Sequence, residues 1–171
     1  MNIVRWIRWV FRRKSMLNWI NQTFHRNFSQ EDIDAARDFT LLWNVLEGVV
    51  FHTSFSIASA EQRFQQRQFN EQPFLPFYNY FKNRYIDGNG LPNQRFAALH
   101  FRQADRQAFV QQTLINPASQ TGEKILALTI IVYRLRNNLF HGIKDIPSLD
   151  QQRANFENAN GFLMVLLSYF V

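Results

Sequence analysis

Cysteine is absent from the 171 residues of this chain, and the residues that shape tight turns are scarce. Without cysteine there is neither a disulfide nor a cysteine-based zinc site, and the composition is compatible with a reducing cytoplasm, where we expect the protein to be. Only 6 Gly and 5 Pro leave little material for a turn-dense β fold. No segment alternates between apolar and polar residues as a half-buried strand would.

Long apolar runs are missing as well. The longest ones, residues 125–133 and 162–171, fall short of the roughly 20 residues that span a bilayer, and are better explained as buried helices. Hydrophobic side chains are nevertheless abundant, at 46% of the residues, and 18 of them are Phe. This composition predicts a single globular domain over residues 1–171 with a substantial core.

Acidic residues are absent from the first 14 positions, which carry five basic residues. The rest of the chain has 14 basic and 13 acidic residues, so five of the six net positive charges lie in this segment. Arginines interrupt its apolar run and no small-residue cleavage site follows, so a signal peptide is not expected.

Residues 1–20 are predicted to form a basic amphipathic helix, for which three interpretations are open. It is a core or dimer helix, it follows RNA phosphates, or it lies on an anionic membrane. The first is favoured because six apolar residues on one stripe are difficult to leave exposed. They are Ile3, Trp6, Ile7, Val10, Leu17 and Ile20.

Helical periodicity covers most of the chain and predicts an all-α helical bundle. Ser29 is a candidate N-cap, and residues 87–90 are a turn inside the domain. The expected helices cover residues 3–24, 30–51, 58–69, 74–85, 93–101, 103–114, 121–141 and 149–170.

The helix over residues 121–141 is the most regular of these and ends in a polar segment. Its apolar residues repeat at helical spacing and form a seam, namely Ile125, Leu128, Val132, Leu135 and Leu139. The adjacent face carries Arg134, Asn137, Asn138 and His141. We therefore expect this helix to pack with one side and to present a polar cleft with the other.

These residue types suit the cleavage of RNA without a metal or another cofactor. Histidine can take the 2′-hydroxyl proton or protonate the leaving 5′-oxygen near neutral pH. Arginine can hold the negative charge of the phosphorane-like transition state, and asparagine can orient the ring or the phosphate. Because His141 supplies only one proton-transfer group per chain, two copies facing each other in a homodimer would complete the site.

The segment from Arg136 to His141 resembles the arginine-to-histidine signature of the HEPN superfamily, with four residues between the two. Residues 133–142, with Lys144, look like the longer form in its Apea-like and abortive-infection branches. The resemblance implies an all-α, HEPN-like helical bundle that dimerises through the motif helices. It also implies a metal-independent endoribonuclease of toxin–antitoxin, anti-phage or CRISPR-linked defence, regulated by a cognate antitoxin or another protein. By the same match Arg136, His141 and Asn137 are the catalytic residues.

A second, shorter resemblance lies upstream. Residues 39–47 are similar to the aromatic-then-acid helix that these domains often carry, and Glu47 sits beside the apolar stripe. An acid in that place needs a partner, and Arg136 is the expected one. The residues that we expect to bind substrate are Asn138, Arg134, Lys144 and Glu47.

Other functions remain open on the sequence. In one HEPN branch a Tyr accepts nucleotidyl groups near the motif, but here Ile143 stands in its place, so that modification is not expected. His25, His52 and His100 lack the spacing of metal ligands, and no metal site is expected. The motif residues could also be a solvated helix end. The protein would then be a non-catalytic module that binds nucleotide or protein partners, or a peripheral membrane interaction protein.

Overall fold

The computed structural model describes residues 16–140 and 150–171, and these parts of the chain form helices and no β-strand. The predicted all-α fold is confirmed. The helices, in chain order, are α2 (Met16–Phe24), α3 (Gln30–Phe51), α4 (Ile57–Gln65), α5 (Leu75–Tyr85), α6 (Gln94–Ala97), α7 (Gln107–Ile115), α8 (Thr121–Phe140) and α9 (Arg153–Leu167). Short 3-10 turns cover Gln72–Phe74, Gln103–Asp105 and Asp150–Gln152.

The long helix α3 begins and packs as its sequence predicts. Ser29 is its N-cap: its hydroxyl accepts a hydrogen bond from the Asp32 backbone N–H at 3.2 Å. The Asp32 carboxylate accepts the Ser29 N–H at 2.8 Å in return. The buried stripe of the helix comprises Phe39, Trp43, Leu46 and Val50. This stripe faces α9, where Phe156 stacks on Phe39 with 5.2 Å between ring centroids.

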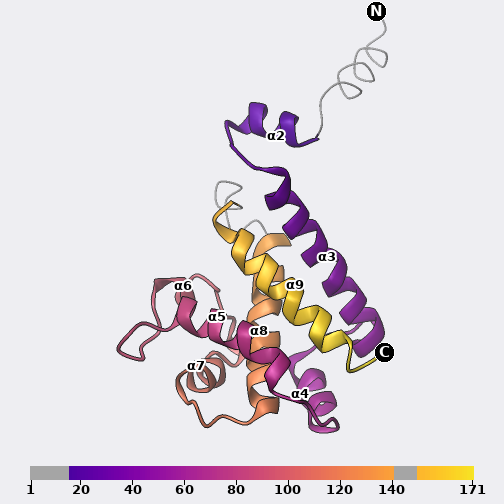
Figure 1. The fold of residues 1–171 in the computed structure, drawn as a ribbon, viewed down its shortest axis with the longest axis vertical. Helices are drawn as coiled ribbons and strands as arrows, with labels where there is room; N and C mark the ends of the chain where they lie inside the picture. The colour runs from indigo at the N-terminus through magenta and orange to yellow at the C-terminus, as the bar shows by residue number, and fades with distance from the viewer. Residues whose placement is uncertain (1–15, 141–149) are drawn as a thin grey trace, which may run out of the picture.

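Helix α8 runs through the middle of the molecule, and α3, α4, α5 and α7 all contact it (Figure 1). Residues 124–132 are buried without interruption, so its core surface covers the whole circumference rather than one seam. The expectation of a helix with one packed side and one open polar side is therefore wrong. A helix that is apolar all round belongs inside a protein, and α8 has neighbours on every side.

Several helices end at other residues than predicted. The helix expected over residues 58–69 ends at Gln65. In place of the helix expected over 93–101 the structure has only the short helix α6. Asn93 caps it, because its side-chain oxygen accepts hydrogen bonds from the N–H groups of Arg95 and Phe96. The chain then turns at His100, whose φ of 52° is left-handed and ends helical geometry there.

Helix α2 departs most from expectation. It covers only the described part of the helix predicted for residues 3–24, and it buries no residue at all. Leu17 and Ile20 are half-buried, so within a single chain they do not join the core. The other four residues of that stripe lie outside the described residues. No helix in the described part of the chain has both the length and the hydropathy to cross a membrane.

Candidate functional site

Arg136 and Glu47 form the centre of the candidate site. Nη2 of Arg136 lies 3.8 Å from Oε2 of Glu47, which confirms the expected pairing of α8 with α3. At this distance the two groups attract each other as charges but share no hydrogen bond. The two side chains are 29% and 23% exposed, respectively, so solvent reaches both of them.

The remaining contacts of the Arg136 guanidinium leave some of its N–H donors without a partner. Nη1 donates to Oδ1 of Asn137 at 3.1 Å, and the guanidinium carbon lies 5.0 Å from the ring centre of Phe140. Nε is buried without a hydrogen-bond partner. A guanidinium has five N–H donors, so Nη2 and the second hydrogen of Nη1 can still bind an incoming anion.

Aromatic side chains close to the ion pair in the sequence join α3 and α8. Trp43 precedes Glu47 by four residues, and Tyr133 precedes Arg136 by three. Their ring centroids lie 5.8 Å apart, and Phe55 contacts both, at 5.0 Å from Trp43 and 4.7 Å from Tyr133. The helices that carry Glu47 and Arg136 are therefore held together by an aromatic contact as well as by the ion pair.

Arg134, two residues before Arg136, is buried and only 1% exposed. Its Nε and Nη2 donate to the backbone carbonyls of Leu99 and His100 at 3.1 and 2.6 Å. Its Nη1 lies 3.0 Å from Oδ2 of Asp105 as an ion pair outside hydrogen-bond geometry. The guanidinium thus holds the segment between α6 and α7 against α8.

Asn138 serves the same segment, one turn after Arg134. It is fully buried, and its Nδ2 donates to the carbonyls of Ala98 and Leu99 at 3.3 and 3.2 Å. Its Oδ1 accepts from Arg134 at 3.4 Å. The expectation that Arg134 and Asn138 line an open polar face is therefore wrong, because both side chains are occupied with backbone groups that would otherwise be buried without partners.

Helix geometry explains why Arg134 and Arg136 have different surroundings. Residues two apart on an α-helix differ by about 200° in direction, whereas residues four apart share a face. Arg134 and Asn138 accordingly point to one side of α8, and Arg136 and Phe140 to the other. Asn137 lies between these directions and is 3% exposed, so it positions Arg136 rather than facing solvent.

His141, Ile143 and Lys144 lie outside the described residues, so the site is defined here by Arg136, Asn137 and Glu47. Asp105 is the buried partner that sequence reasoning missed. Its acidic type alone gave no signal, because only the folded chain brings it to Arg134 across 29 residues.

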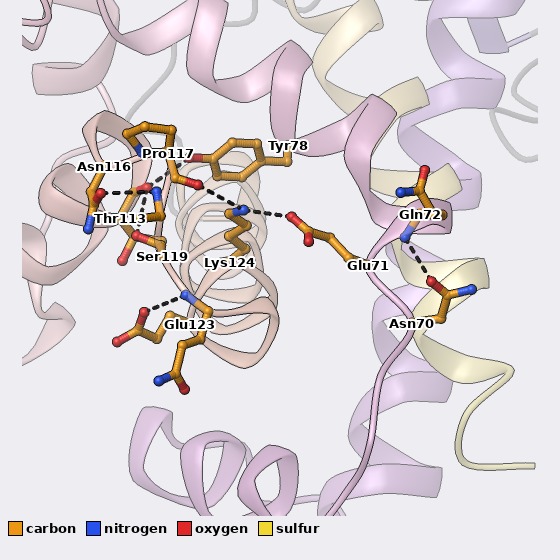
Figure 2. A network of polar contacts seen from close by, with 12 residues as sticks. Asn70, Glu71, Gln72, Tyr78, Thr113, Asn116, Pro117, Ser119, Glu123 and Lys124 are labelled. Atoms are coloured by element: carbon orange, nitrogen blue, oxygen red, sulfur yellow. Dashed lines mark hydrogen bonds and ion pairs between the residues drawn. The ribbon is translucent and has the colours of Figure 1, made fainter.

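A second buried charge lies at the opposite end of α8 (Figure 2). Nζ of Lys124 donates to Oε1 of Glu71 at 2.6 Å and to the carbonyl of Pro117 at 3.4 Å. The hydroxyl of Tyr78 donates to the Thr113 carbonyl at 2.8 Å, and its burial raises the pKa of this phenol. Lys124 is 12 residues before Arg136, about 18 Å along the axis, so this network supports the fold and not the candidate site.

No metal centre is evident in the described part of the chain, where no three His, Asp or Glu side chains gather closely enough to hold an ion. His25, His52 and His100 instead occupy left-handed backbone positions at turns, with φ between 50° and 52°.

Comparison with known proteins gives no relative: no protein-family model, curated protein or solved structure matches this chain.

Proposed function

We propose that this protein is a metal-independent endoribonuclease that acts as a homodimer in a toxin–antitoxin, anti-phage or CRISPR-linked defence system. The observation that carries the proposal is the position of Arg136. It is a permanently charged guanidinium, partly open to solvent and with donors to spare, in the last turn before His141. The proposal also rests on the resemblance of residues 133–142 to the HEPN signature.

In the proposed reaction, Arg136 binds the non-bridging oxygens of the scissile phosphate and stabilises the charge that accumulates there. His141 of one protomer removes the proton from the 2′-hydroxyl, whose oxygen attacks the phosphorus. The bond to the 5′-oxygen breaks, and the partner's His141 protonates that oxygen. The products are a 2′,3′-cyclic phosphate and a 5′-hydroxyl end.

Glu47 and Asn137 act in this scheme as positioning residues. Asn137 holds Nη1 by a hydrogen bond, and Glu47 attracts Nη2 from the neighbouring helix. Together they restrict a long side chain that would otherwise sample many rotamers. Because the Glu47 contact is 3.8 Å long, a phosphate can compete for Nη2 without breaking a hydrogen bond.

The test is an RNA cleavage assay in EDTA with the full chain. We expect cleavage to continue in the chelator, and His141→Ala and Arg136→Ala each to reduce its rate by a factor of about 10² to 10⁴. Arg95→Ala and His100→Asn are matched controls, because both side chains are exposed and Asn tolerates the left-handed backbone at position 100. Strict Mg²⁺ dependence, or full activity of both motif variants, would refute the proposal.

A second function, a non-catalytic module that binds nucleotide or protein partners, is favoured by one observation. Arg134 and Asn138, both within the motif segment, are fully occupied in holding residues 98–105. A motif kept for this structural reason alone would leave Arg136→Ala folded and without effect on any RNA. The cleavage assay therefore separates the two functions.

A further inference from the structure

Helix α2 is amphipathic, yet none of its apolar side chains is buried in the described part of the protein. A polar side chain, Asn21, ties α2 to the following chain. Its Nδ2 donates to the carbonyl of Phe28, and its Oδ1 accepts the Phe28 N–H, both at 2.9 Å. Figure 1 shows α2 at one end of the molecule, beyond the start of α3 and apart from the packed helices.

The apolar side of α2 is broad and largely open. At 100° per residue its apolar side chains span an arc of about 160°. They are Met16, Leu17, Trp19, Ile20 and Phe24, and none of them is buried. Met16, Trp19 and Phe24 are 64%, 40% and 43% exposed. Exposed apolar surface of this extent on one short helix is typical of an interaction site.

The charge of the surrounding sequence shows which kind of contact. Residues 1–30 contain six Lys or Arg and no acid, whereas residues 31–171 contain 13 basic and 13 acidic residues. The entire formal charge of +6 therefore belongs to the segment that includes α2. Three of the four Trp residues, Trp6, Trp9 and Trp19, also belong to it, and Trp is the side chain that prefers the headgroup level of a bilayer.

We infer that α2 docks on an anionic lipid surface. Its apolar arc enters the boundary between headgroups and acyl chains, and the basic residues that precede it in the sequence attract the acidic headgroups. The inference is independent of RNA cleavage, since none of the residues involved belongs to the candidate site.

A lipid surface accounts for these features better than the two other candidate occupants. RNA would explain the basic residues, but α2 itself carries no charged side chain, and Met16, Leu17 and Ile20 offer nothing to phosphates. A second copy would cover the apolar arc, but it would bring two strongly basic segments together, which repel each other. An anionic membrane satisfies both the apolar arc and the charge.

The experiment measures sedimentation of the full chain with lipid vesicles. One set is phosphatidylcholine alone, and the other is phosphatidylcholine mixed with anionic phosphatidylglycerol. We expect binding to the anionic set, weakened by high salt, and about tenfold weaker for Trp19→Ser, because one large apolar side chain is lost. Leu41→Ser is the control, since Leu41 is 56% exposed on α3 and lies outside α2.

Folding does not confound the measurement, because α2 contributes no buried residue and Trp19→Ser should leave the melting temperature unchanged. Three results would overturn the inference. The first is equal binding of wild type and Trp19→Ser to anionic vesicles. The second is no vesicle binding, with RNA affinity that depends on Trp19. The third is no vesicle binding, with a wild-type dimer that Trp19→Ser dissociates.

Discussion

Arg134 and Arg136 show how two residues of one type, two positions apart, acquire different roles. The first is enclosed and bonded to backbone carbonyls and Asp105, while the second is partly open and lies beside Glu47. Removing a buried charge partner leaves the remaining acid and carbonyls without donors, which is costly. Removing a partly solvated one mainly returns its neighbours to water.

We therefore expect Arg134→Ala to lower the free energy of unfolding by about 3 kcal/mol or more, and Arg136→Ala by less than about 1 kcal/mol. Urea denaturation followed by circular dichroism measures both. Asp105→Asn combined with Arg134→Met should cost less than the sum of the two single changes, because the pair is removed together. Equal losses for Arg134→Ala and Arg136→Ala would contradict this account.

Glu47→Gln provides a test of the positioning role at the same scale. The substitution keeps the shape of the side chain and removes the negative charge near Nη2 of Arg136. On the proposed function we expect tighter binding of a non-cleavable 2′-O-methyl RNA and slower cleavage of the natural RNA. Anisotropy and a single-turnover assay would measure these. A faster cleavage step would show that Glu47 only competes with the phosphate.

At the scale of the element, two helical glycines have opposite surroundings. Gly48 of α3 is exposed, and a Cβ built there meets nothing within 4 Å. A Cβ on Gly161 of α9 would lie 2.5 Å from Cε1 of Phe77. The close approach of α5 to α9 therefore depends on the missing side chain at 161, while glycine at 48 only costs helix propensity.

Accordingly, Gly48→Ala should raise the free energy of unfolding by about 0.5–1 kcal/mol. Gly161→Ala should lower it by about 1–2 kcal/mol, because the Phe77 ring must move out of a packed contact. Thermal unfolding of the two variants side by side checks the pair. A stabilised Gly161→Ala would mean that the ring of Phe77 rotates away freely.

Sequence reasoning worked where a signal is local. Ser29 and Asp32 lie within one turn and predict their own cap, and the pairing of Glu47 with Arg136 follows from the unusual place of an acid beside an apolar stripe. Prediction from the sequence failed where the burial of a residue depends on which other helices pack against its side of the helix. Periodicity gave α8 a seam but not its other neighbours, and it placed Leu17 and Ile20 on the stripe of a core or dimer helix, whereas neither is buried in the described chain.

At the scale of the whole molecule, the proposed reaction needs two copies of the site. We expect a two-fold dimer in which both Arg136–His141 pairs share one cleft. Phe140 is 54% exposed at the end of α8, where facing motif helices would meet. Phe140→Ser should therefore shift the protein toward monomer at micromolar concentration, as measured by light scattering.

Leu41→Ser distinguishes this interface from another one. Leu41, Val45 and Val49 form an exposed stripe on the outer face of α3, so a dimer that dissociates on Leu41→Ser but not on Phe140→Ser would use that stripe. A wild-type protein that is monomeric under the same conditions would refute the composite site.

Because four helices enclose α8, we expect its amide hydrogens to exchange later than those of the outer parts of the chain. None of α3, α4, α5 and α7 can separate from it without exposing part of residues 124–132 to water, so these amide hydrogens exchange only when the whole body unfolds. Helix α2 has no such enclosure, and its amide hydrogens exchange through fraying of a single helix. A deuterium-labelling time course should therefore show α2 exchanging first and the middle of α8 last.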